Sequence, residues 1–192
     1  MSRRIEVILE YWFENITDDT PARFKESPFS KWFFAGEAVD ALLRDTFGED
    51  LKKAREGIYD TWLTTARGSL AFIVLADQFS RNIHRDKPEA FDIDTRAQEV
   101  AVQTIEKGFE NELSCIERVF LYMPLMHAEN LELQNKCVEC FQRLVNDSKE
   151  ICPDNTSYFA NNLKYARDHR SDIEEHGRFI YRDEVLGRGN KE

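Results

Sequence analysis

The fold centres on residues 68–83, which read GSLAFIVLADQFSRNI. Leu70–Ala76 is apolar at every position, which predicts a helix whose first two turns are buried on all sides. Gly68 and Ser69 supply a start signal for this helix, and the breaker Asp86-Lys87-Pro88 ends it. We therefore expect a central helix over residues 70–83.

Apolar residues elsewhere recur at the i, i+3, i+4, i+7 spacing of helices with one buried face. In the first half of the chain we expect helices over residues 5–13, with Ser2 as the cap, over 37–47, ending at Gly48, and over 49–56, which is exposed. In the second half we expect helices over 94–108, capped by Asp94, over 114–122, with a capping box between Ser114 and Glu117, and over 125–145. A long helix follows the break at Cys152-Pro153-Asp154 and has Phe159, Leu163, Ala166 and Ile173 in one apolar stripe. Pro124 either kinks a helix or separates 114–122 from 125–145. Residues 17–29 are expected to form a loop pinned by Phe24 and Phe29.

No stretch shows sustained period-2 alternation, so the predicted fold class is all-α, with about eight helices. The 192 residues include only 8 glycines and 5 prolines, which fits long uninterrupted elements. The length suits a single domain over residues 1–192. Residues 177–192 are punctuated by glycine and are expected to form an extended C-terminal tail.

Charge and hydropathy exclude two classes of partner. The chain has 26 Lys and Arg against 36 Asp and Glu, a net charge of −10, and an acidic surface repels nucleic acid. Leu70–Ala76 is the longest strongly apolar run and is far too short to cross a bilayer. Glu6 and Glu10 interrupt the apolar N-terminal segment, which argues against a signal peptide. We expect a soluble, cytoplasmic protein with no nucleic-acid partner and no membrane partner.

The cysteines are Cys115, Cys137, Cys140 and Cys152. A domain of this length does not need disulfides, so we expect reduced thiols. Cys137 and Cys140 form a CxxC pair inside a helical pattern, and no second pair accompanies it. We interpret these two residues as thiols on one helix face.

A zinc site of the deaminase type is excluded by distance. His127 and Glu129, followed by Cys137 and Cys140, are similar in residue type to the zinc-deaminase signature. In one continuous helix, His127 and Cys137 stand roughly 15 Å apart along the axis, too far to share a zinc ion. The sequence therefore predicts no metal site and no cofactor.

The first candidate site follows the apolar turns of the central helix and comprises Asp77, Gln78, Arg81, Asn82 and Arg85. Asp77, Arg81 and Arg85 are four residues apart and continue an apolar stripe, so their side chains are expected to point inward or into a cleft. A buried charge needs a partner. These residues form either an internal Asp–Arg network, which this stretch alone favours, or a pocket whose guanidinium groups bind an anion or a carboxylate.

Two further groups of polar residues lie later in the chain. His127 and Glu129 adjoin the core side of a predicted helix, where His127 is either a hydrogen-bonded core residue or a general base. His169, Arg178 and Arg182 belong to a segment whose basic and acidic residues balance, so it has no net field to attract a polyanion. We interpret this segment as a docked tail whose arginines act as internal clamps.

Four parts of the chain carry a resemblance. They are Tyr11-Trp12-Phe13, then Asp77-Gln78-Phe79 with Arg81-Asn82 and Arg85, then Met123–Glu129, and finally His169 with Gly177-Arg178-Phe179 through Gly187-Arg188. Together they resemble the uncharacterised family named domain of unknown function 924, over nearly the whole chain. The resemblance implies a tetratricopeptide-repeat-like superhelix of stacked antiparallel helices, and it supplies no established activity. Tyr181 stands where the family has a histidine, which argues against an indispensable catalytic role for that histidine here.

Three functions are compatible with these residues. We favour a non-enzymatic module that binds a peptide or a small anionic ligand through an inner surface. The candidate ligand-binding residues are Asp77, Gln78, Arg81, Asn82, Arg85, His127, Glu129, His169, Arg178 and Arg182. A purely structural scaffold, with every polar group satisfied internally, comes second. A small-molecule enzyme that uses His127 with Glu129 or Asp77 as its acid–base pair comes last, because no nucleophile motif, phosphate loop or complete metal set is present.

Overall fold

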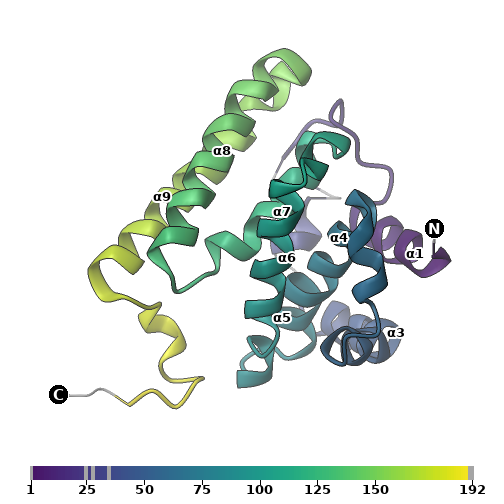
Figure 1. Ribbon diagram of the computed structural model, residues 1–192, viewed down its shortest axis with the longest axis vertical. Helices are drawn as coiled ribbons and strands as arrows, with labels where there is room; N and C mark the ends of the chain where they lie inside the picture. Colours follow the sequence, from purple (N-terminus) through teal and green to yellow (C-terminus); the bar gives the residue numbers. More distant parts are fainter. Residues whose placement is uncertain (1, 24–25, 27–28, 34–35, 190–192) are drawn as a thin grey trace.

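A computed structural model of the chain describes residues 2–23, 26, 29–33 and 36–189. These residues form helices and turns and contain no β-strand, which confirms the predicted all-α class (Figure 1). The α-helices are α1 (Arg3–Phe13), α2 (Ser30–Phe33), α3 (Glu37–Arg55), α4 (Ala66–Ile73), α5 (Ser80–Ile83), α6 (Asp94–Glu106), α7 (Cys115–Met126), α8 (Leu131–Ile151) and α9 (Thr156–His176). Short helical turns connect them, namely η1 (Asp60–Thr64), η2 (Val74–Phe79), η3 (Pro88–Ala90), η4 (Phe109–Glu112), η5 (Pro153–Asn155) and η6 (Ile180–Arg182).

The central segment is buried as predicted, but it is not one regular α-helix. It begins at Ala66, because the Thr65 side chain caps it by accepting a hydrogen bond from the Gly68 backbone N–H. After Ile73 the backbone widens into the π-helical turn η2 and returns to α geometry in α5. Asp77 lies in this π-helical turn, a kind of distortion that is frequent at functional sites.

Aromatic side chains join the central segment to its neighbours. The Trp12 ring of α1 lies 5.4 Å from Phe79 and 5.6 Å from Phe120 of α7 between ring centroids. The Trp32 ring of α2 lies 4.7 Å from Phe120, and its indole N–H donates to the Trp12 carbonyl at 2.9 Å. Phe29, one of the two residues predicted to pin the N-terminal loop, is buried against Trp32, whereas Phe24 lies outside the described residues.

The prediction that a helix ends at Gly48 and a separate one follows was wrong, because α3 runs unbroken from Glu37 to Arg55. Leu43, Phe47, Leu51 and Ala54 continue one buried stripe through the glycine. Burial of that stripe outweighs the cost of about 1 kcal/mol that a glycine adds inside a helix.

The boundary predicted at Pro124 was also misplaced. α7 contains Pro124 and ends at Met126, and the break between helices lies at residues 127–130. Asn130 caps α8 by accepting a hydrogen bond from the Leu133 backbone N–H at 3.0 Å. The buried Gln134 amide donates to the carbonyls of Met126 and Ala128, which satisfies the end of α7. His127 is consequently the capping residue that directly follows α7, and it does not lie on a helix with Cys137.

Several caps confirm the sequence analysis and one corrects it. Ser2 caps α1, and Ser114 with Glu117 forms the predicted capping box of α7. Asp94 does not cap α6: it is the first residue of that helix, and its side chain binds arginine instead. Among the described residues, no helix combines the length and the apolar character that a membrane span requires.

α8 and α9 pack along each other's length, and the tail folds back from the end of α9 (Figure 1). Gly177 ends α9 in the left-handed conformation, and the chain then forms the short turn η6. The tail up to residue 189 is thus docked on the helices, and Arg182 within it is buried. The regular repeat-like stacking that the family resemblance implies stays a prediction.

We predict that Gly68→Ala unfolds at a markedly lower urea concentration than the natural chain. A Cβ atom at residue 68 would lie 2.1 Å from the Trp62 carbonyl oxygen and 2.9 Å from the Thr65 hydroxyl, and such overpacking costs about 1–3 kcal/mol or more. Gly48→Ala is the matched control, because nothing lies within 4 Å of a Cβ atom there. It should stabilise α3 by about 0.5–1 kcal/mol. Equal urea midpoints for the two variants would contradict this packing.

Candidate functional site

Polar side chains from four separate segments meet around η2, and we call this group the Asp77 cluster. It consists of Asp77, Arg81, Asp94, His127 and Arg182. Asp77 and Arg81 come from η2 and α5, Asp94 begins α6, His127 ends α7, and Arg182 belongs to η6 in the tail. The cluster therefore ties the central segment to α6, to α7 and to the C-terminal tail.

The Asp77 carboxylate contacts three side chains, two through hydrogen bonds and Arg81 through an ion pair. Its Oδ1 atom lies 2.7 Å from Nδ1 of His127 and 3.0 Å from a terminal nitrogen of Arg81. The Gln78 amide donates to Oδ2 at 2.5 Å. Only 1% of the Asp77 side chain is exposed, against 18% for His127. The carboxylate is thus inaccessible, while the imidazole that it holds keeps one edge toward solvent.

These contacts set the charge of Asp77. Burial on its own would raise the pKa of its carboxyl group, but the charges of Arg81 and His127 and the hydrogen bonds from His127 and Gln78 lower that pKa well below its usual range. Asp77 is consequently an anion at neutral pH. An anionic partner at Nδ1 favours the imidazole tautomer that carries its proton on Nδ1, which leaves Nε2 with a free lone pair. No described residue forms a hydrogen bond with Nε2 of His127.

The two arginines of the cluster are engaged with internal partners. Arg81 binds Asp94 through two parallel hydrogen bonds, each 2.8 Å long, and also donates to the Asp77 backbone carbonyl. Burial lowers the pKa of Arg81, but Asp77 and Asp94 more than offset this effect and raise it overall. Arg182 donates to the His127 carbonyl at 3.1 Å, and its guanidinium carbon lies 4.8 Å from the Phe91 ring centroid. Two aspartates neutralise two arginines, so the cluster offers no unpaired positive charge.

The other predicted residues of the central segment lie at the edge of the cluster or outside it. Gln78 is buried beside Asp77, and its amide also contacts the Met123 sulfur at 3.2 Å. The Asn82 side chain donates to the Gln78 carbonyl. Arg85 points elsewhere and binds Asp40 of α3 through two hydrogen bonds of 2.6 and 2.9 Å. α5 ends at Ile83 and Arg85 follows in the turn, where it lines a surface pocket of about 600 Å³. Of the two predicted orientations, inward or into a cleft, Arg85 therefore has the second.

Glu129 and the tail arginines form a separate set of contacts. Glu129 accepts hydrogen bonds from the Phe179 backbone N–H at 3.0 Å and from Arg188 at 2.9 Å. Arg178 binds Asp183, five residues further along the tail. Glu129 therefore holds the tail and is not hydrogen-bonded to His127. Of the two carboxylates that the sequence offers to His127, the structure pairs it with Asp77.

His169 brings a second imidazole near the cluster. Its Nδ1 donates to the Tyr165 carbonyl at 2.9 Å, one turn earlier in α9, and its ring packs on Phe179 of the tail at 5.3 Å between centroids. Burial lowers the pKa of His169, and the charges of His127 and Arg182 lower it further, while the backbone hydrogen bond opposes the shift. The imidazole is accordingly neutral at pH 7, with Nε2 as its free nitrogen.

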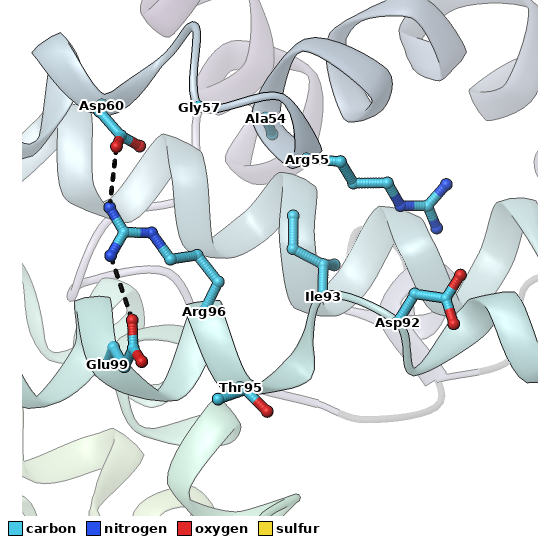
Figure 2. A pocket seen from close by; sticks show the side chains of 9 residues that line it. All are labelled: Ala54, Arg55, Gly57, Asp60, Asp92, Ile93, Thr95, Arg96 and Glu99. Carbon is cyan, nitrogen blue, oxygen red and sulfur yellow. Dashed lines mark hydrogen bonds and ion pairs between the residues drawn. The ribbon is translucent and has the colours of Figure 1, made fainter.

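The surface also has pockets whose lining includes arginines. One pocket of about 450 Å³ lies between the end of α3 and the start of α6 (Figure 2). Figure 2 shows Arg96 between Asp60 and Glu99, which it binds, whereas Arg55 extends along the opposite side, near Asp92. Three carboxylates against two guanidinium groups make this pocket unsuitable for an anion. It contains none of the residues predicted to bind a ligand.

Metal-binding side chains meet at one place in the described part of the chain, although the sequence analysis predicts no metal site. Cys137 and Cys140 are both buried on α8, as predicted, and do not gather with His127 or Glu129. The zinc-deaminase arrangement is therefore still excluded, although His127 and Cys137 do not share the helix on which that exclusion was based. The residues that do gather are Asp18, Cys115 and Cys152, which sequence reasoning missed because they are far apart in the chain and form no spaced motif.

Asp94 and Phe91 were missed as well. Asp94 was interpreted only as a helix cap, and its position at the start of a helix gave no sign of its pairing with Arg81. Phe91 lies in the turn before α6, where its ring faces both Arg81 and Arg182. An aspartate and an aromatic residue shortly before a predicted helix are too common to indicate a site.

Comparisons with known proteins agree with this architecture. Residues 8–192 match the profile of a family described as bacterial protein of unknown function, DUF924. A solved structure of a protein of unknown function from Agrobacterium tumefaciens is similar, with 29% sequence identity and a TM-score of 0.74. The similarity covers 97% of this chain and 91% of that one. No curated protein matches the chain.

We predict that Arg81→Ala lowers the free energy of unfolding by about 2–4 kcal/mol, because it leaves the carboxylates of Asp77 and Asp94 buried without their shared cation. Urea denaturation followed by circular dichroism measures this loss. Arg23→Ala is the control, since Arg23 pairs with Glu26 while 65% of its side chain is exposed. Such a surface pair contributes less than about 1 kcal/mol. Equal losses in the two variants would show that the Asp77 cluster does not stabilise the fold.

A second prediction concerns acid. The native pKa of Asp77 lies below the ordinary value of 3.8, so between these two values the unfolded chain binds a proton that the native chain does not. The stability that Asp77 contributes is therefore present above pH 3.8 and declines as the pH falls from 3.8 toward the native pKa. Asp77→Asn should lose stability less steeply than the natural chain over this acid range, in urea denaturation at stepwise lower pH. Parallel pH profiles would be the contrary result.

Proposed function

The chain belongs to the DUF924 family of bacterial proteins of unknown function, and from this premise we propose that His127 is an acid–base group acting on a small polar molecule, with Asp77 orienting its imidazole. One observation carries the proposal. A fully buried, ionised aspartate lies 2.7 Å from Nδ1 of a histidine whose side chain is 18% exposed. This is the geometry by which a carboxylate fixes the tautomer of a general base.

The chemistry follows from the charge of Asp77. With the proton held on Nδ1, Nε2 of His127 can take a proton from a bound molecule, and Asp77 stabilises the imidazolium that forms. The same group can return the proton as an acid. A positioned acid–base group of this kind typically contributes about 10²–10⁴-fold to a rate. Arg182 supports the arrangement by binding the His127 carbonyl, which fixes the backbone that carries the ring.

His169 is the second group in this proposal. It lies close enough to His127 for the charge of one imidazole to lower the pKa of the other, after the larger effect of burial. Its neutral ring and free Nε2 suit a proton acceptor or a hydrogen-bond partner for the same substrate. Two imidazoles with Nδ1 engaged and Nε2 free support proton transfer more than they support simple packing.

The arginines support a different role from the one that the sequence favoured. A module that binds acidic peptides or small anions needs guanidinium groups with free donors. Arg81, Arg178 and Arg182 are paired with carboxylates or carbonyls of the chain itself, and Arg85 is paired with Asp40. We therefore assign these four arginines to the internal network and the acid–base role to His127. The structural role thus belongs to the four arginines and the proposed enzymatic role to His127.

We predict that His127→Gln abolishes turnover of the substrate while the chain stays folded. Screening would use activated esters, lactones, amides and phosphate esters, each compared with the same mixture without protein. For any compound turned over, the rate should fall by about 10²–10⁴ in His127→Gln. His176→Gln is the control, because His176 ends α9, is not part of the Asp77 cluster and forms an ion pair with Glu175. An undiminished rate in His127→Gln would exclude His127 as the acid–base group.

The tautomer gives a test that needs no substrate. Long-range ¹H–¹⁵N spectra of the imidazoles should show the neutral His127 ring protonated on Nδ1, because Asp77 accepts that proton. Asp77→Asn removes the anion and should shift the ring toward the other tautomer. A neutral His127 protonated on Nε2 in the natural chain would contradict the proposal before any activity is known.

A further inference from the structure

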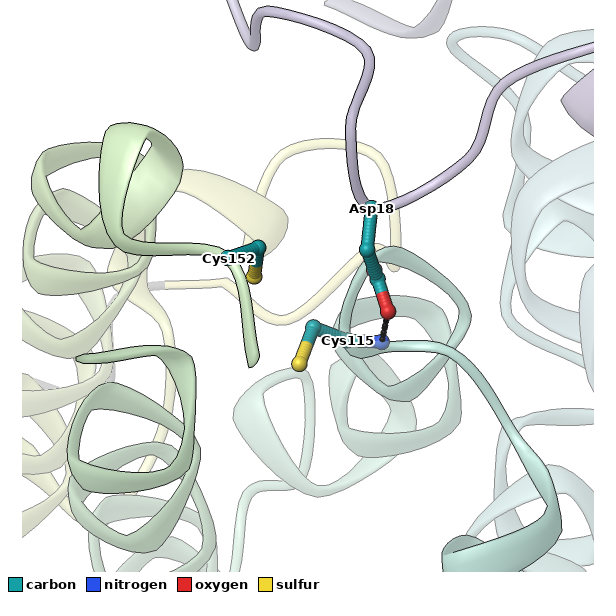
Figure 3. Close-up of side chains that lie close together, drawn as sticks. All are labelled: Asp18, Cys115 and Cys152. Carbon is teal, nitrogen blue, oxygen red and sulfur yellow. Dashed lines mark hydrogen bonds between the residues drawn. The ribbon is translucent and has the colours of Figure 1, made fainter. Parts of the chain in front are cut away.

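Three side chains that can ligate a metal ion meet where the N-terminal loop crosses the start of α7. They are Asp18 in the loop after α1, Cys115 at the first position of α7, and Cys152 at the end of α8. One carboxylate oxygen and the two sulfur atoms all lie within 4.8 Å of one another. Figure 3 shows the Cys152 and Cys115 side chains close together, with the Asp18 side chain pointing down from the loop toward the backbone nitrogen of Cys115.

The carboxylate is held in place by the protein itself. Asp18 accepts hydrogen bonds from the backbone N–H groups of Cys115, at 3.1 Å, and Ile116, at 3.2 Å. An ionised carboxylate has about four lone-pair positions, so two backbone hydrogen bonds leave others for a cation. The donor group is therefore oriented and still able to bind.

Asn155 fixes the loop that presents Asp18. Its buried amide donates to the carbonyls of Asp18 and Thr20 at 2.7 and 2.9 Å, and its oxygen accepts from the Ala22 N–H at 2.8 Å. Asn155 follows Cys152 by three residues, so one short turn positions both a thiol and the loop that carries the carboxylate. Partners of this kind, which orient metal ligands, typically raise metal affinity by about 10–100-fold.

We infer that Asp18, Cys115 and Cys152 form a binding site for one zinc ion. Two thiolates and one carboxylate are ligands that zinc accepts, and three protein ligands leave the fourth tetrahedral position for water. On binding, the two thiols release two protons, and the zinc ion with its three anionic ligands carries one net negative charge. This charge lies at the N-terminus of α7, where the helix dipole stabilises an anion.

The other two cysteines of the chain serve as a comparison for the proposed zinc site. Cys137 and Cys140 are buried on α8 and, among the described residues, do not gather with a third metal-binding side chain. They are therefore the internal control for thiols without a site. The zinc site would also connect three segments that are remote in sequence, namely the N-terminal loop, α7 and the turn between α8 and α9.

Cobalt titration tests the site in the full chain. The protein is stripped of metal, reduced with a phosphine so that no competing thiol is added, and titrated with Co²⁺, whose thiolate complexes absorb in the near ultraviolet. We expect saturation at one equivalent, displacement of the band by one equivalent of Zn²⁺, and release of two protons. Cys115→Ser and Cys152→Ser should lose the band, Asp18→Asn should weaken binding, and Asn155→Ala should weaken it by about 10–100-fold. Cys140→Ser should bind like the natural chain.

Several results would overturn the inference. The first is the absence of the cobalt band in the reduced natural chain, and the second is a band that persists after loss of Cys115 or Cys152. The third is a reduced chain that binds no metal but forms a Cys115–Cys152 disulfide in air. Circular dichroism shows whether each variant folds. If a cysteine variant unfolds, alkylation of the natural chain replaces it: one equivalent of Zn²⁺ should protect Cys115 and Cys152 in peptide mass mapping without changing the labelling of Cys140. Unprotected Cys115 and Cys152 would reject the site.

Discussion

One buried charge organises the middle of this protein. Asp77 is ionised in a place from which water is excluded, and an isolated carboxylate there would be prohibitively costly. Gln78 and His127 each supply a hydrogen bond and Arg81 supplies an ion pair, and together these contacts make the charge tolerable. Because His127 ends α7 and Arg81 also binds the first residue of α6, the same charge fixes how these two helices approach the central segment. Removing any one of these three side chains leaves the Asp77 carboxylate buried with only part of its negative charge compensated.

The acidic composition of the chain explains why its arginines pair with carboxylates of the same chain. Because the chain has a net charge of −10, its guanidinium groups have carboxylates of the same chain close by and pair with them in the absence of any ligand. Arg81 forms an ion pair with Asp94, Arg85 with Asp40, and Arg178 with Asp183. A row of arginines in a sequence therefore indicates an anion site only when their partners are known, and here the partners neutralise them.

Local patterns in the sequence were sufficient for much of the architecture. Periodic apolar residues predicted the all-α class, the burial of the central segment and the capping box at Ser114. Pairings between distant residues were beyond such patterns, because nothing in the sequence links Asp77 to a particular histidine fifty positions later or Asp18 to Cys115. The helix boundaries predicted at Gly48 and Pro124 were misplaced for another reason. A glycine inside a helix costs about 1 kcal/mol and a proline about 3 kcal/mol or more, and the buried faces of α3 and α7 outweigh these costs.

The break after Met126 shows how a small error in a boundary changes the interpretation of a site. On a continuous helix, His127 would face the core beside Gln134 and would be one more satisfied polar residue. In the structure it is the C-cap residue directly after α7, its ring contacts Asp77, and its carbonyl accepts a hydrogen bond from Arg182. Gln134, which satisfies the carbonyls at the end of α7, maintains that break. The partly exposed imidazole on a buried anion thus depends on α7 ending at Met126, four residues before the Asn130 cap of α8. This break is a property of tertiary packing that periodicity alone does not encode.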